Sequence, residues 1–287
     1  MGGGLGHLFR TLAILKNAPS LHGRVRVLAT APPPDFMTVD GVTVDAPPKR
    51  VLNDRRAYYA YLVHYFENHR IRAIVIDTFP GGIVGELSDL FKNHPRLLLA
   101  RHLDVEQYGK RLGKRTPPKP VRTLVIEPLP EALEPLITPL RNTTRLSGPL
   151  APADLRTVPV LLPRREVAAV VHSREGEELG QLKRAARRAL SGASVERVDV
   201  ITPQHNPMLF YQARQRYTTI VSGAGYNMAA LARLALPHQR HILVPFERRF
   251  DDQFSRARRV ARTEPGTETN QIDVASAWLR YGLKSLA

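Results

Sequence analysis

Residues 221–260, VSGAGYNMAALARLALPHQRHILVPFERRFDDQFSRARRV, decide the fold prediction for this chain. An apolar run enters a glycine-rich turn at residues 222–225, and a helical pattern follows the turn. A second apolar run then leads to Asp-Asp-Gln at residues 251–253, ahead of a basic helical pattern. Strand, tight turn, helix and strand in this order are typical of a parallel α/β sheet.

Other short apolar runs are predicted to be buried parallel strands, because they are rich in Val, Ile and Leu and are flanked by turn residues. The predicted strands lie at residues 24–30, 71–77, 96–102, 123–128, 167–173, 195–201, 217–223 and 240–246. Helical patterns lie between many of them, at residues 8–15, 54–69, 84–92, 176–190, 227–234, 251–261 and 274–283. The alternation predicts an α/β fold with right-handed crossovers.

The alternation breaks between residues 128 and 163, where prolines are frequent and periodicity is poor. Such a stretch is typical of a linker between two units. We therefore predict two α/β domains, residues 1–148 and residues 149–287. The basic, proline-rich residues 110–122 are expected to form an exposed loop.

The composition is that of a basic protein without cysteine. Lys and Arg number 42 against 26 Asp and Glu, a net charge of +16. The lack of cysteine excludes disulfides, Cys nucleophiles and Cys-ligated zinc. The charge favours polyanionic partners, with a solvated basic surface as the alternative. Nucleic acid is the least favoured of these partners, because the chain has one Trp and no aromatic-basic stripe on which bases could stack.

The chain has no run approaching the ~18 apolar residues that span a bilayer. Its opening, MGGGLGH, lacks the basic and apolar regions of a secretory leader. These features predict a cytoplasmic protein. Basic surfaces such as residues 110–122 and 181–190 could rest on the inner, anionic face of a membrane, although a solvated helix face is the alternative for the second.

Two glycine-rich turns are candidates for phosphate binding, because glycine lets the backbone approach a ligand and a helix N-terminus favours negative charge. The first contains Gly4 and Gly6 and is followed by His7, but it departs from the dinucleotide fingerprint and no strand precedes it. The second, which begins at Ser222, follows a strand and therefore lies where open α/β sheets bind ligands. The alternatives are a tight turn without a ligand and a capping or surface role for His7.

Four polar positions near strand ends complete the candidate site. Asp252 and Gln253 could bond sugar hydroxyls, whereas Asp251 is expected to cap the helix that follows. Asp77 ends the predicted strand at residues 71–77, and it is expected either to orient His7 or to cap its own turn.

With these motifs the sequence resembles the GT-B glycosyltransferases, in particular the family of the peptidoglycan GlcNAc transferase that makes lipid II. The resemblance covers most of the chain and rests on GGGLGHLFR, SGAGYN and VPFERRFDDQFSRA. It implies two Rossmann-like domains facing a central cleft, with the acceptor side first and the nucleotide-sugar side second. It also implies inverting transfer from a nucleotide-diphosphate sugar, commonly a UDP-sugar, to a hydroxyl acceptor that can be lipid-linked, with no metal or other cofactor.

Carried over residue by residue, the resemblance gives His7 as a candidate base or acceptor-side contact. Asp77, which is chosen for its place at a strand end, is the candidate to orient His7 or to bind the acceptor. The donor side would comprise Gly4, Gly6, Ser222, Gly223, Ala224, Gly225, Asn227, Asp252 and Gln253. One departure concerns the ribose, which the family usually grips with a Glu at the position of Leu231. A degenerate, non-catalytic GT-B binding or partner protein therefore stays open as a second function, and sugar epimerisation as a related one. Under the second function, a Glu at position 231 is expected to raise nucleotide affinity.

Overall fold

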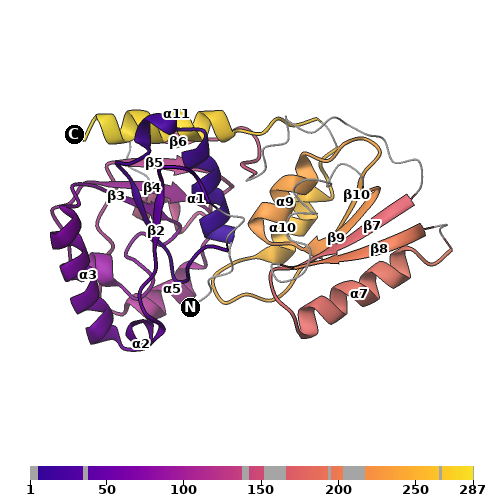
Figure 1. The fold of residues 1–287 in the computed structure, drawn as a ribbon, viewed down its shortest axis with the longest axis horizontal. Coiled ribbons are helices and arrows are strands. Elements are labelled where there is room, and N and C mark those ends of the chain that lie inside the picture. The colour runs from indigo at the N-terminus through magenta and orange to yellow at the C-terminus, as the bar shows by residue number, and fades with distance from the viewer. Residues whose placement is uncertain are drawn as a thin grey trace.

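The protein contains two parallel four-stranded sheets, one in each half of the chain, with helices packed around them (Figure 1). This architecture is that of a computed structural model, which describes residues 6–34, 38–137, 142–151, 166–192, 195–202, 217–264 and 267–286. Gly4 lies outside the described residues. The prediction of an α/β fold with two Rossmann-like parallel-sheet units is confirmed.

The first unit is built on a sheet of order β3-β4-β5-β6 in which all neighbours are parallel. Its strands are β3 (Ile74–Asp77), β4 (Arg96–Ala100), β5 (Arg122–Val125) and β6 (Thr143–Arg145). A separate two-stranded parallel sheet joins β1 (Arg26–Leu28) to β2 (Thr43–Asp45). The helices are α1 (Gly6–Lys16), α2 (Lys49–Leu52), α3 (Arg55–His69), α4 (Glu86–Asp89), α5 (Val105–Leu112) and α6 (Glu134–Ile137), with a 3-10 turn, η1 (Pro19–Leu21).

The second unit has the strand order β10-β9-β7-β8. Its elements are β7 (Glu166–Val171), α7 (Glu177–Ala189), β8 (Val195–Ile201), β9 (Thr219–Gly223), α9 (Tyr226–Arg233), β10 (Arg240–Val244) and α10 (Gln253–Val260). The chain leaves β7 toward β8 on one side and later returns to β9 on the other side. The strand order therefore reverses between β7 and β9, and the carboxyl ends at such a reversal are the usual ligand-binding edge of a parallel sheet.

The last helix, α11 (Ile272–Lys284), returns to the first unit and lies along it (Figure 1). Trp278 and Leu279 belong to the same buried apolar cluster as Leu97 and Leu124 of the first sheet. The Ser276 hydroxyl also donates to the backbone carbonyl of Ile14 at 3.0 Å. The domain division at residue 148 stays a prediction, but α11 completes the core of the first unit although it comes from the C-terminal half.

Side-chain caps explain where several helices begin. The Asp54 carboxylate accepts from the N–H of Arg56 at 2.7 Å, at the start of α3. Asp104 accepts in the same way from the N–H of Gln107 at 2.9 Å, at the start of α5. The helix that starts at this cap runs to Leu112, so it enters the stretch of residues 110–122 that was expected to be a loop. No helix in the described part of the chain is long and apolar enough to cross a membrane.

Two other predictions about the elements need correction. The helix predicted at residues 84–92 is reduced to α4, because Gly85 and Phe91 on either side have positive φ angles of 85° and 56°. The three-residue strands β2 and β6 were not predicted from the sequence. Both are partly exposed and too short for a clear alternating pattern.

Candidate active site

Charged residues follow three neighbouring strands at the carboxyl edge of the first sheet. Asp77 is the last residue of β3, Arg101 directly follows β4, and Glu127 lies two residues beyond β5. Because these strands are adjacent and parallel, the three residues lie along one edge of the sheet. The second unit meets this edge through Arg256 of α10, whose Nε is 3.0 Å from Glu127 Oε2. The candidate site is therefore the junction of the two units.

His7 and Asp77, the two predicted catalytic residues, are in contact. His7 lies in the first turn of α1, and its Nδ1 is 3.1 Å from Asp77 Oδ2. Arg10, one turn along α1, places Nη2 at 2.6 Å from both oxygens of the same carboxylate. Arg10 Nη2 also lies 3.3 Å from His7 Nδ1. The contact of Nδ1 with Asp77 is the shorter of the two and a carboxylate only accepts, so we assign the ring proton to Nδ1, which makes Nε2 the acceptor nitrogen.

Burial and neighbouring charges set the protonation states of this pair. Burial lowers the pKa of His7 below its ordinary value of 6.5, and the charges of Arg101 and Arg10 reinforce the shift against the opposing effect of Asp77. Burial alone would raise the pKa of Asp77, but the charge of Arg10 beside it holds that pKa well below its usual range. Near pH 7 the pair is a neutral imidazole held by an ionised carboxylate, the state in which His can accept a proton.

The turn after β3 holds this arrangement in place. Thr78 has a left-handed backbone conformation, with a φ of 78°, and is buried. Its hydroxyl donates to Asp77 Oδ1 at 2.9 Å and accepts from Arg101 Nε at 3.1 Å. A β-branched residue in this conformation costs of order 1–3 kcal/mol, so the surrounding contacts must maintain it. The turn thereby fixes Asp77 and Arg101 relative to each other.

The second glycine-rich turn is closely packed. Ser222 and Ala224 are fully buried. A Cβ on Gly223 would lie 3.2 Å from the ring of Phe246, which is tighter than ordinary contact. The backbone N–H of Ala224 donates to the Val244 carbonyl at 3.1 Å. That N–H, one of the groups expected to face a diphosphate, is therefore engaged within the protein.

The N-terminus of α9 is open by comparison. Gly225 is its N-cap residue, and among the described residues no side chain caps the helix and no atom lies within 4 Å of a Cβ built on Gly225. Asn227 Nδ2 donates to the Gly6 carbonyl at 2.9 Å, so the first turns of α9 and α1 touch. The N-terminal ends of α1 and α9 therefore meet at the junction. The first N–H groups of a helix have no partners within it, which favours an anion at this position.

Asp252 and Gln253 form contacts within the second unit. Asp252 Oδ1 accepts from the N–H of Ser255 at 2.9 Å and is the N-cap of α10. Gln253 is buried, and its Oε1 accepts from the N–H of Phe246 at 3.1 Å. The expectation that Asp251 caps the helix is wrong, because Asp252 takes that place. The sugar contacts expected of Asp252 and Gln253 stay predictions.

A buried ion network ties the two units together, and sequence reasoning missed it. Arg256 is 3% exposed, and its guanidinium contacts Glu127 at 2.9 and 3.0 Å and Asp251 at 2.6 and 3.0 Å. It also donates to the Ala224 carbonyl at 3.2 Å. The only signal in the sequence was a carboxylate directly after an apolar strand. Its partner lies 129 residues away, beyond the reach of any local pattern.

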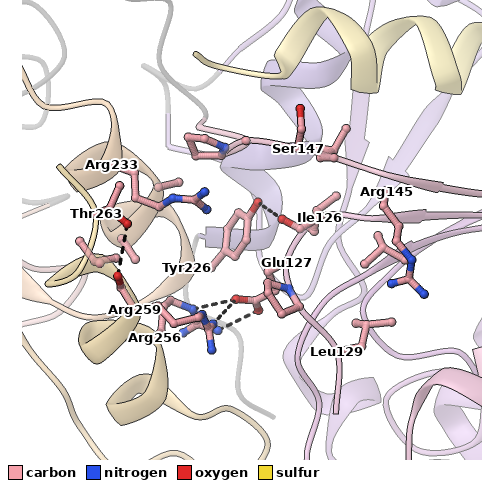
Figure 2. A pocket seen from close by; sticks show the side chains of 18 of the residues that line it. Ile126, Glu127, Leu129, Arg145, Ser147, Tyr226, Arg233, Arg256, Arg259 and Thr263 are labelled. Carbon is pink, nitrogen blue, oxygen red and sulfur yellow. Dashed lines mark hydrogen bonds and ion pairs between the residues drawn. The ribbon is translucent and has the colours of Figure 1, made fainter. Parts of the chain in front are cut away.

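A cavity of about 470 Å³ lies beside this network, between the units (Figure 2). Residues after β5 and β6 form one wall, and α9 and α10 form the other. The ring of Tyr226 stands between them, with its hydroxyl donating to the Ile126 carbonyl at 3.2 Å. The volume falls in the range of roughly 300–1,000 Å³ typical of small-molecule sites.

The chemistry of the cavity wall is mixed. Apolar groups such as Leu129 and Ala230 line it, and four arginines reach it, namely Arg145, Arg233, Arg256 and Arg259. The Arg259 side chain is 40% exposed, and its guanidinium touches only Glu127, at 3.5 Å, among the residues that the structure describes. Such a wall suits a ligand with a flat or apolar body and anionic groups.

Leu231, which stands where the family usually has a ribose-binding Glu, is not at the cavity. Its side chain is 1% exposed and packs in the core of the second unit with Ile201, Tyr217 and Ile220. Its neighbour Ala230 is the residue that lines the cavity. A side chain at position 231 therefore lies in the core of the second unit.

Leu231→Glu is accordingly expected to destabilise the protein rather than to raise its nucleotide affinity. A buried, unpaired carboxylate costs more than the cavity left by Leu231→Ala, for which about 2–5 kcal/mol is expected. Urea denaturation checks this, with Phe254→Glu at an exposed position of α10 as the control. A Leu231→Glu protein as stable as the wild type would contradict the placement of this side chain.

No metal site was found in the described ranges, where no group of three or more His, Cys, Asp or Glu side chains is placed to hold an ion. Neither a family model nor a curated protein sequence matches the chain. The structure is similar to the crystal structure of Acinetobacter baumannii MurG, with a TM-score of 0.47 and 15% sequence identity. The similarity covers 100% of this chain and 91% of that one.

Proposed function

We propose that this protein is an inverting glycosyltransferase that uses a nucleotide-diphosphate sugar, with His7 as the general base. In the proposed step, His7 Nε2 removes the proton of an acceptor hydroxyl as its oxygen bonds to the anomeric carbon. The bond from that carbon to the phosphate oxygen breaks on the opposite face, and the nucleoside diphosphate leaves. Such a reaction needs a base and a way to stabilise the departing charge.

The observation that carries the proposal is the contact between the N-terminal ends of α1 and α9 beside the His7–Asp77 pair. His7 follows Gly6, and Gly6 accepts the hydrogen bond of Asn227 from the first turn of α9. A neutral imidazole whose Nε2 has no partner in the described part of the chain, and a helix N-terminus that no described side chain caps, are thus brought to one junction. These two elements correspond to the base and to the leaving-group site that glycosyl transfer requires.

The cavity supports a place for the nucleoside. It is lined by Tyr226 and Ala229 of α9, so a diphosphate at the N-terminus of this helix would adjoin it. Apolar contact with Ala229 and charge contacts with Arg259 would then hold the donor without a metal. The base of the nucleotide, the sugar, and an acceptor at an anionic membrane stay predictions.

Gly225→Trp is expected to abolish nucleotide binding. The wild-type φ of −61° and the empty space around the missing Cβ let this position accept a side chain without strain, and the indole would occupy the approach to α9. Calorimetric titration with UDP, GDP, dTDP and ADP should show micromolar binding of one nucleotide to the wild type and none to the variant.

Gly109→Trp is the matched control, because a Cβ at this exposed position of α5 also meets nothing within 4 Å. It should bind the nucleotide as the wild type does. Equal binding by Gly225→Trp would place the nucleotide elsewhere, and failure of the wild type to bind any of the four would overturn the donor site.

A second candidate is a degenerate GT-B protein that binds a ligand or a partner without catalysis. It is favoured because the groups expected to contact the nucleotide-sugar are hydrogen-bonded to other groups of the protein. The N–H of Ala224, the carboxylate of Asp252 and the amide oxygen of Gln253 all have partners inside the second unit. Nucleotide binding without any sugar transfer would support this candidate over the enzyme.

A further inference from the structure

Arg101 is a buried cation whose hydrogen-bonding capacity is largely unused. It is 8% exposed, and its Nε donates to the Thr78 hydroxyl at 3.1 Å. Its Nη1 lies 3.9 Å from Glu127 Oε1 and 3.7 Å from Asp251 Oδ1, beyond hydrogen-bond distance. Within the described ranges no acceptor bonds its terminal nitrogens. The terminal nitrogens of Arg101 therefore have donor capacity that a further anion could use.

The neighbouring carboxylates are committed to other arginines. Asp77 is held by Arg10 at 2.6 Å, and Glu127 and Asp251 are both held by Arg256 at 3.0 Å or less. The two carboxylates nearest to Arg101, those of Glu127 and Asp251, are therefore bonded more closely to Arg256. Of the three guanidinium groups that surround the ring of Tyr226, those of Arg10, Arg101 and Arg256, that of Arg101 is the one with no carboxylate within hydrogen-bond distance among the residues that the structure describes.

Arg101 also lies between the two halves of the candidate site. Thr78 links it to Asp77 and so to the pair with His7. On the other side, Asp251 and Arg256 link it to the carbonyl of Ala224 in the glycine-rich turn. An anion bound by Arg101 would therefore be next to both the candidate base and this turn.

We propose that Arg101 is a phosphate-binding residue, and that Glu127 and Asp251 hold it loosely until a phosphate group takes its free donors. A guanidinium presents its terminal nitrogens in a fork that matches two phosphate oxygens. The inference rests on the proposed function, since the diphosphate of the donor is the natural occupant. It adds a side-chain cation to a site that otherwise depends on backbone groups and a helix N-terminus.

The test is calorimetric titration of the full chain with inorganic pyrophosphate at low salt. The wild type should bind, and Arg101→Gln should weaken binding by about tenfold or more, the loss expected for a charge-assisted hydrogen-bonding pair. Arg187→Gln, on the exposed face of α7, should leave the affinity unchanged. No binding by the wild type, equal affinity of Arg101→Gln, or the same loss in Arg187→Gln would each overturn the inference.

Arg101→Lys provides the test if Arg101→Gln does not fold. It keeps the charge but loses the fork, so a several-fold loss of pyrophosphate affinity is expected, and an unchanged affinity would contradict the inference.

Sugar transfer in the same proteins separates the two proposals. Pyrophosphate binding that depends on Arg101, without transfer, keeps the inference and overturns the enzyme. Sugar transfer by a protein whose pyrophosphate affinity does not change in the Arg101 variants keeps the enzyme and overturns the inference.

Discussion

His7→Ala is expected to reduce sugar transfer by about 10²- to 10⁴-fold while nucleotide binding stays close to that of the wild type. Its imidazole has a supporting carboxylate in Asp77, and none of the described residues occupies its acceptor nitrogen. The substitution leaves Asp77 paired with Arg10 at 2.6 Å, so the fold is expected to tolerate it. Initial rates of nucleoside diphosphate release, together with calorimetry, measure the two effects separately.

The pH profile adds an independent check on His7. Because burial lowers the pKa of His7 below 6.5, the imidazole is protonated and inactive only at pH values below that pKa. The rate constant kcat/KM should therefore rise through a pKa below 6.5 and stay level above it. His64→Ala, on the exposed face of α3, is the matched control and should keep both rate and profile. A His7→Ala enzyme with the wild-type profile would remove His7 from the mechanism.

Arg256→Met is expected to lower the free energy of unfolding by about 3–5 kcal/mol. The change removes the cation that satisfies Glu127 and Asp251, and both carboxylates are left buried at the junction of the two units. Methionine keeps most of the apolar part of the side chain, so the lost stability is due to the charge contacts and not to a cavity. Urea denaturation measures the free energy of unfolding.

Arg258→Met on the same helix is the control, because that side chain is exposed and its replacement should change stability by less than ~0.5 kcal/mol.

The wild type and Arg256→Met should also differ in how their stability responds to acid. The pKa of Asp251 is lowered from 3.8 to about 2 by Arg101 and Arg256, which overcome the effect of burial. Its ion pair therefore stabilises the wild type above about pH 4 and is lost toward pH 2, so the deficit of Arg256→Met should shrink in that window. A deficit no larger than that of Arg258→Met would contradict the buried network.

Most of the fold was predictable from local patterns. The stretch after Val221 is a strand, turn and helix as expected, because a buried strand, paired glycines and an apolar helix face each leave a local signal. The return of α11 to the first unit was not predictable, since an amphipathic helix does not specify which core it packs on. Trp278 joins the core of the first unit although its helix follows the second.

The site was predictable only in its glycine-rich parts. Gly6 and Gly225 belong to stretches that have a sequence signature, and the structure brings together the helix N-termini that begin at these two residues. Arg256, Glu127 and Arg101 have no such signature. Their role at the junction comes from contacts between residues more than a hundred positions apart or on different strands, and one sequence contains no record of such pairing.

The most direct test of the account is nucleoside diphosphate release from a panel of nucleotide-diphosphate sugars, with water as the acceptor where no other is known. The account predicts release from one donor by the wild type and by Gly109→Trp, and its loss in His7→Ala and Gly225→Trp. Release that survives in both of these variants would place the chemistry away from the junction. Nucleotide binding by the wild type with no release from any donor would contradict an active transferase and favour the non-catalytic binding protein.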